Sequence, residues 1–179
     1  MSDDILIRTA EPNDFKFLPH IENEAANLFR SFVAVFDDSL PPAPESYYHS
    51  LPQCAEVFIA TTQNNNIVGF VVVKTLDSQA YIAEIDVLPD YGHKGIGRKL
   101  LERAILWAQN HSYDYITLTT FKNIPFNAPF YRKLGFCEFT PDEKSSDLKK
   151  VIQNETEIFG DHLKENPRIA MKLNLRNNP

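Results

Sequence analysis

The stretch VLPDYGHKGIGRKLL, from Val87 to Leu101, links a short apolar run to a segment with helical spacing through a turn that contains three glycines. A turn between a strand and a helix favours anions, because the first N–H groups of a helix lack intrahelical partners and the helix dipole is positive there. The glycines let the backbone approach a ligand closely. The stretch therefore predicts a phosphate-binding turn.

The turn lacks residues that two nucleotide-binding motifs require. A P-loop requires Lys-Ser or Lys-Thr directly after its last glycine, whereas Arg98 and Lys99 follow Gly97. A dinucleotide fingerprint requires a third glycine where Leu100 stands, and an acidic residue about 20 positions later, where this chain has threonines. The ligand expected at this turn is therefore neither a P-loop nucleotide nor a dinucleotide.

The pattern along the rest of the chain predicts strands and helices in one mixed α/β domain, residues 1–179. Strands are expected at residues 4–8, 56–62, 67–75, 80–88, 115–120, 136–139 and 168–175. Helices are expected at residues 14–32 (regular only from Pro19 on), 95–110 and 128–134. The proline-rich residues 32–49 predict a loop with a short helical turn, and residues 140–167 are mostly polar with one amphipathic portion.

Composition excludes several classes of protein. The 179 residues are 43% hydrophobic and 23% charged, a globular balance. A net charge of −6 argues against a general nucleic-acid binder, and no apolar run approaches the roughly 20 residues of a membrane span. Two cysteines and five histidines show no metal-ligand spacing, and the N-terminus lacks a signal-peptide pattern. We expect a cytoplasmic protein with no metal, no nucleic acid and no membrane partner.

The glycine turn, read as Pro-Asp-Tyr, a basic residue, Gly-Ile-Gly, Arg and Leu-Leu, closely resembles the pyrophosphate loop of the GNAT superfamily of acetyl-CoA-dependent N-acetyltransferases. A second stretch, NAPFYRKLGF from Asn127 to Phe136, is similar to the asparagine–tyrosine element of that family. The order of elements also agrees from Ile5 through Phe139. The resemblance implies a GNAT fold, with a central, mostly antiparallel sheet of about six to seven strands, a splayed parallel pair and flanking helices.

The same resemblance implies an acetyl-CoA site. It would use the strand residues Ile85, Asp86 and Val87, the loop residues Gly92, His93, Lys94, Gly95, Ile96, Gly97 and Arg98, and further along the chain Asn127 and Phe130. One position departs from the family pattern, because Gly92 stands where Gln or Arg is common. A side-chain contact to the phosphates is therefore missing, and we expect His93 or Lys94 to compensate.

Two catalytic roles follow from the resemblance. Tyr131 matches a tyrosine that lies near the thioester sulfur and can protonate the leaving thiolate. An attacking ammonium must first lose a proton, and Glu84 and Asp86 share one face of their strand because side chains alternate. Either carboxylate could be the base, and we nominate Glu84. Glu24, on the first helix, is another candidate contact to an amine.

The acceptor site is the least defined part of the prediction. Phe32, Phe36 and Tyr48 lie in the aromatic and acidic residues 32–50, where the family varies its substrate site, although loop packing explains these aromatics equally well. The resemblance implies direct acetyl transfer to the primary amine of a small molecule, without a covalent enzyme intermediate. Acetylation of a protein N-terminus or lysine, and a non-catalytic acyl-CoA-sensing module, are the alternatives. A homodimer would also fit the family.

Overall fold

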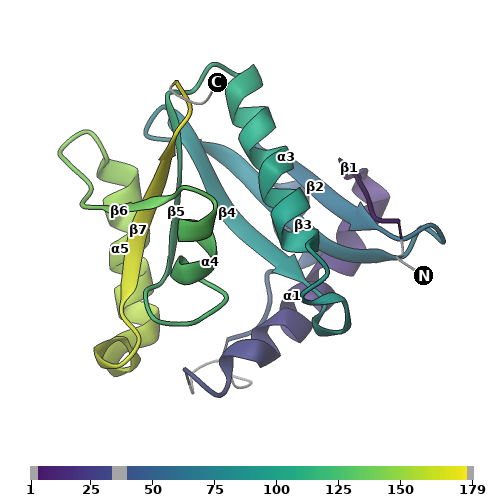
Figure 1. The fold of residues 1–179 in the computed structure, drawn as a ribbon, viewed down its shortest axis with the longest axis horizontal. Helices are drawn as coiled ribbons and strands as arrows, with labels where there is room; N and C mark the ends of the chain where they lie inside the picture. Colours follow the sequence, from purple (N-terminus) through teal and green to yellow (C-terminus); the bar gives the residue numbers. More distant parts are fainter. Residues whose placement is uncertain (1–3, 34–39, 177–179) are drawn as a thin grey trace.

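Within the part of the chain that the structure describes, the strands form one seven-stranded sheet in the order β1-β2-β3-β4-β5-β7-β6 (Figure 1). The computed structural model describes residues 4–33 and 40–176. The strands are β1 (Leu6–Thr9), β2 (Glu56–Thr61), β3 (Ile67–Leu76), β4 (Gln79–Val87), β5 (Tyr115–Phe121), β6 (Cys137–Phe139) and β7 (Arg168–Asn174). Within this sheet β4 and β5 are parallel and the other neighbours are antiparallel. The predicted mixed sheet with one parallel pair is confirmed.

Helices cover both faces of the sheet. They are α1 (Leu18–Ala26), α2 (Glu45–His49), α3 (Ile96–Asn110), α4 (Ala128–Lys133) and α5 (Ser146–Phe159), with short 3-10 helices η1 (Pro12–Phe17), η2 (Asn27–Phe29), η4 (Pro89–Tyr91) and η5 (Gly160–Lys164). Side chains of α3 and α4 share a core with β2 to β5, whereas α1 and α2 pack against the opposite face of β2 and β3. Helix α5 packs on β4 and β7 through Tyr81, Leu148 and Ala170. Within the described ranges, no helix is long and apolar enough to span a bilayer.

Two helices differ from the sequence expectation. The expected first helix is shorter, because Pro19 lies in the first turn of α1 and the chain continues as 3-10 helix after Ala26. The polar stretch expected to be only partly amphipathic holds the 14-residue helix α5. Its first N–H groups, those of Asp147 and Leu148, both donate to the Asp77 carboxylate at 2.9 Å. This cap comes from the distant β3–β4 turn, so local sequence could not reveal it.

A β-bulge in β4 sets which side chains face which helices. Val73 pairs with Ile82 but the adjacent Val72 pairs with Glu84, so Ala83 is an extra residue in β4. An extra residue inverts the alternation of the strand from that point on. Ile82 and Ile85 therefore both pack toward the α3 core. Glu84 is turned to the opposite face, where a cavity lies.

The parallel strands β4 and β5 separate soon after they meet. Their paired residues are Ala80 with Ile116 and Tyr81 with Thr117, at the start of both strands. From Ile82 to Val87, β4 pairs with β3 alone. The backbone edge of β4 that faces β5 is consequently available to other groups over this length. The expected splayed pair is confirmed, and it opens the sheet where the glycine turn begins (Figure 1).

Gly69 of β3 permits the close approach of β4 at this opening. A Cβ on Gly69 would lie 2.7 Å from the main-chain oxygen of Asp86 and 3.3 Å from Cδ1 of Leu100. We expect Gly69→Ala to lower the free energy of unfolding by about 1–3 kcal/mol, because β4 or α3 must shift. Urea unfolding measures this change. Gly97→Ala is the control, since the nearest atom to its Cβ would be 3.9 Å away. Equal urea midpoints for Gly69→Ala and the unaltered protein would contradict the close approach.

Candidate active site

Two cavities meet where β4 and β5 separate. One, of about 510 Å³, runs along the glycine turn, and we call it the glycine-loop cavity. The other, of about 360 Å³, lies between α1, β4, β5 and α5, and we call it the acidic cavity. The residues that line both are Phe29, Ile85, Asp86, Asn127 and Tyr131. We call this shared region the junction, and a ligand in each cavity would meet the other there.

The glycine-loop cavity is lined by most of the predicted cofactor residues. Its walls include Ile85, Asp86, Val87, Gly92, His93, Gly95, Ile96, Gly97, Arg98, Asn127 and Phe130. Lys94 is not among them, since its Nζ lies over the Tyr91 ring, 4.7 Å from the centroid. Of the two residues expected to compensate for Gly92, His93 lines the cavity and Lys94 does not. Arg98 donates to Glu102 at 2.8 Å, one turn along α3.

The glycine turn presents the N-terminus of α3 to this cavity. Gly95 caps the helix with φ of 78°, a left-handed conformation that glycine adopts readily. The Lys99 N–H donates back to the Gly95 carbonyl, so the N–H groups of the preceding first-turn residues lie ahead of the helical ladder. A Cβ at Gly95 would meet nothing within 4 Å. An uncrowded helix N-terminus beside an apolar cavity fits the pyrophosphate and pantetheine of acetyl-CoA.

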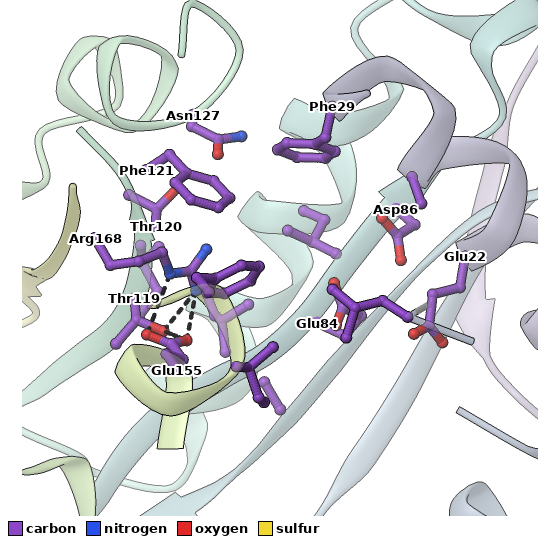
Figure 2. A pocket seen from close by; sticks show the side chains of 18 of the residues that line it. Glu22, Phe29, Glu84, Asp86, Thr119, Thr120, Phe121, Asn127, Glu155 and Arg168 are labelled. Atoms are coloured by element: carbon purple, nitrogen blue, oxygen red, sulfur yellow. Dashed lines mark hydrogen bonds and ion pairs between the residues drawn. The ribbon is translucent and has the colours of Figure 1, made fainter. Parts of the chain in front are cut away.

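The acidic cavity is named for its carboxylates. Glu22 from α1, Glu84 and Asp86 from β4 and Glu155 from α5 all line it (Figure 2). Arg168 is the one cationic side chain among the described residues of its wall. A cavity with this excess of negative charge favours positively charged ligands.

The two carboxylates of β4 differ in exposure. The Glu84 side chain is exposed on the wall of the acidic cavity, and desolvation by the surrounding walls, reinforced by the negative charge of Glu22, raises its pKa to about 7. Burial, followed by repulsion from Glu84, raises the pKa of Asp86 well above its ordinary value. Asp86 is 9% exposed, and its Oδ2 is buried without a hydrogen-bond partner. At neutral pH Glu84 is therefore near the midpoint of its titration.

Glu22 is fixed on the opposite wall. Its carboxylate accepts hydrogen bonds from the Ala43 N–H, at 3.1 Å to each oxygen, and from the Tyr48 hydroxyl at 2.9 Å. Burial raises the pKa of Glu22 despite these two donors, which act in the opposite direction. The contacts hold the side chain in one place but leave part of its acceptor capacity unused.

Arg168 is paired within the protein. Its guanidinium donates to both oxygens of Glu155, at 2.5 and 3.1 Å, and to the Thr119 hydroxyl at 3.1 Å (Figure 2). The Thr119 hydroxyl in turn donates to Glu155 at 2.6 Å. Arg168 also lies 4.7 Å from the Phe121 ring centroid. This cluster neutralises Glu155 and ties α5 to β5 and β7.

Tyr131 projects from α4 into the junction. It is 7% exposed, and its ring contacts Phe130 and Phe136 edge-on, with centroids 5.2 and 5.8 Å apart. Burial, together with the nearby carboxylates of Glu84 and Asp86, raises the pKa of Tyr131 above its usual range. The hydroxyl therefore keeps its proton over the whole range of ordinary assays and is available as a donor.

The predicted acceptor residues are not gathered in the acidic cavity. Phe32 lines the glycine-loop cavity, and Tyr48 is buried behind the wall where it supports Glu22. Phe36 lies outside the described residues. Glu24 lines neither cavity, because it points away from the face of α1 that carries Glu22.

Sequence reasoning missed Glu22 and Glu155, although a signal existed. Helix α1 buries Leu18, Ile21 and Ala25, and position 22 falls on this apolar stripe at helical spacing. In α5 the stripe through Leu148 and Phe159 likewise includes position 155. An acidic residue on an apolar stripe indicates a buried charge with a partner or a function. No comparable signal marks Arg168, the first residue of a strand.

The acidic side chains are not arranged as a metal site. Among the described residues, no group of three or more His, Cys, Asp and Glu side chains could hold a metal ion.

Comparison with known proteins agrees with this geometry. N-alpha-acetyltransferase 30 of Schizosaccharomyces pombe is 26% identical over 108 residues, which cover 58% of this chain and 72% of that protein. The ribosomal-protein-S18-alanine N-acetyltransferase of Escherichia coli superposes with a TM-score of 0.67 at 22% identity, covering 96% of this chain and 94% of the other. A putative streptothricin acetyltransferase of Bacillus anthracis, solved with acetyl coenzyme A, gives 0.64 at 24% identity, covering 97% and 99%.

The family assignment rests on the sequence match. The pattern of the Acetyltransferase (GNAT) family extends over residues 22–136, more than half of the chain, and includes the glycine turn, β4 and Tyr131. It ends before α5 and Arg168, so one wall of the acidic cavity lies outside the shared region. The match turns the resemblance of the glycine turn into a classification: the chain belongs to the GNAT family of acetyltransferases.

Proposed function

We propose that the protein transfers the acetyl group of acetyl-CoA to the primary amine of a small molecule. The observation that carries this proposal is the junction, where the glycine-loop cavity and the acidic cavity share Asp86, Asn127 and Tyr131. A cofactor along the first cavity and an amine in the second would meet beside a proton donor and a carboxylate. When bound, acetyl-CoA supplies a thioester, so that a C–N bond forms on the amine as the C–S bond breaks.

The residues of the chain supply the two proton movements. Glu84, with a pKa of about 7, accepts the proton of the acceptor ammonium, either directly or through one water. Tyr131 holds a proton at the junction for the departing sulfur. Burial and repulsion from Glu84 also raise the pKa of Asp86 well above its ordinary value, and Asp86 is the second candidate for the base. These roles match the acid and base nominated from the sequence.

The walls of the acidic cavity support a small acceptor. Leu40, Pro41 and Pro42 line it from one side and Ile158 and Phe159 of α5 from the other. A volume of about 360 Å³ lies near the lower end of the range of small-molecule sites. A protein acceptor would need an open groove to admit its chain. The name of the S. pombe relative keeps protein N-termini as the second candidate.

The test is the release of thiol from acetyl-CoA in the presence of amines, with the products identified by mass. The panel contains small primary amines, peptides with a free N-terminus, and peptides blocked there with a free lysine. We expect acetylated small amines, with no release above background when the amine is omitted. Faster acetylation of either peptide would favour the protein acceptor. Binding of acetyl-CoA in calorimetry without turnover on any amine would instead support the sensing module.

A further inference from the structure

We propose that the preferred acceptor is a diamine: one amino group reacts at the junction while a second, still an ammonium, is held by Glu22. This inference rests on the proposed function and names its substrate class. It starts from the charges that line the acidic cavity.

The acidic cavity holds more negative charge than the reaction requires. Glu155 is neutralised by Arg168, which leaves Glu22, Glu84 and Asp86 without a cationic partner among the described residues of the wall. One carboxylate is enough to accept the proton of an attacking amine. Burying further carboxylates is costly unless a positive charge arrives with the ligand. The surplus therefore indicates a ligand with more than one positive charge.

An unsatisfied acceptor marks one end of this ligand. The Oδ2 atom of Asp86 is buried without a hydrogen-bond partner, and Asp86 lines the junction. A buried acceptor without a donor is rare in a folded protein and destabilises it. An amino group supplies N–H donors at this position. The orphaned oxygen thus places the reacting end of the acceptor beside Tyr131.

Glu22 marks the other end. It lines the acidic cavity but not the glycine-loop cavity, so it lies away from the junction. Glu84 lies on the same strand, two residues before Asp86 and about 7 Å from it along the strand. The Ala43 N–H and the Tyr48 hydroxyl hold the Glu22 carboxylate in place before any ligand arrives. A pre-positioned carboxylate binds an ammonium with little loss of side-chain entropy.

Two other ligands fit these residues less well. The carboxylates are not grouped as metal ligands among the described residues. An acceptor that carries a carboxylate would need a free cation, but the Arg168 guanidinium already donates to Glu155 and Thr119. A dicationic amine is the ligand whose charge and donors match what the cavity presents.

The first test uses the unaltered protein and acceptors of matched length. For each chain length from three to about six carbons, kcat/KM is measured for the diamine, the amino alcohol, the alkylamine and the ω-amino carboxylate. We expect the best diamine to exceed its alkylamine and amino alcohol by about 10- to 100-fold, since a charge-assisted contact contributes this much. The amino carboxylate should be the poorest. Equal values for diamine and alkylamine, or a preference for the amino carboxylate, would overturn the inference.

The second test assigns the second ammonium to Glu22. Glu22→Gln keeps an acceptor for Ala43 and Tyr48 but removes the charge, so the ratio of diamine to alkylamine should fall close to one. Glu24→Gln makes the same change on the same helix outside both cavities and should leave the ratio unaltered. An unchanged ratio in Glu22→Gln would show that another group selects the acceptor. If Glu22→Gln does not fold, the matched acceptors on the unaltered protein still test the preference for diamines.

The outcomes separate this inference from the proposed function. Turnover of alkylamines without a preference for diamines would leave the acetyltransferase proposal intact and remove only the diamine. If acetyl-CoA binds but no amine of any class causes thiol release, both proposals would be removed.

Discussion

Glu84→Gln should lower kcat with amine acceptors by about 10²- to 10⁴-fold, because the base that accepts the ammonium proton is removed. In the unaltered protein, activity should rise with pH through about 7, where Glu84 loses its proton. Burial and the negative charges of Glu22 and Glu155 raise this midpoint, and Arg168 lowers it. In Glu84→Gln the residual activity should lose this rise. A pH–rate profile measures both effects.

The same variant should be more stable than the unaltered protein at neutral pH. Because folding raises the pKa of Glu84 from an ordinary value of 4.5 to about 7, the unfolded chain releases this proton first as pH rises. The unfolded state is thus favoured progressively between these two values, and the full loss of stability is present above about pH 7. Glutamine removes that loss. The gain in Tm should be larger at pH 8 than at pH 5.

Glu157→Gln is the matched control for both measurements. Glu157 is exposed on α5 and lines neither cavity, so the same loss of charge there should change neither the rate nor the pH dependence of Tm. A Glu84→Gln protein that keeps its kcat and its pH profile would show that another group, with Asp86 the first to test, accepts the proton.

The second large effect is expected from Tyr131→Phe, which should lower kcat by about 10²- to 10³-fold, since a placed donor at a developing charge is lost. The ring contacts with Phe130 and Phe136 remain, so KM for acetyl-CoA and Tm should change little. The rise of activity through pH 7 should also remain, because it belongs to Glu84. Steady-state kinetics across pH measures all three.

Tyr115→Phe controls for the loss of a tyrosine hydroxyl. Tyr115 is on β5 outside both cavities, and its removal should leave kcat unchanged. An intact kcat in Tyr131→Phe would mean that the departing sulfur takes its proton elsewhere. A tenfold rise in KM with kcat preserved would assign Tyr131 to binding alone.

The parts of the fold that sequence predicted are those set by local patterns. The glycine turn, the alternation in β3 and the apolar stripe of α3 each appear within a few residues, and the structure has all three. The extent of α5 was missed because its first turn is capped by Asp77, about 70 residues earlier in the chain. The spacing of residues in the sequence does not predict a contact between such distant positions.

The residues of the candidate site also fall into two groups, those that local sequence patterns predicted and those that only the packing brings together. Residues in the two family-like stretches, such as Gly95, Asn127 and Tyr131, were nominated from sequence and line the cavities. Of the predicted acceptor residues, Phe32 lines the glycine-loop cavity and Tyr48 is buried behind Glu22, because aromatic character does not tell which side of a loop faces a cavity. Glu22 and Arg168 lie far apart in sequence, and only the packing of α1 and α5 across the opened sheet brings them to one cavity.

The extra residue Ala83 has a consequence for reading related sequences. Before Ala83 the even-numbered residues of β4 face the α3 core, and after it the odd-numbered residues do. Any alignment gap in this strand should fall at this residue and not beside it. Deleting Ala83 would remove the bulge and restore regular alternation, with Ile82 and Ile85 still toward the α3 core and Glu84 and Asp86 still on the opposite face. The extra residue thus changes the local bend and twist of β4, whereas the acidic face of the strand does not depend on it.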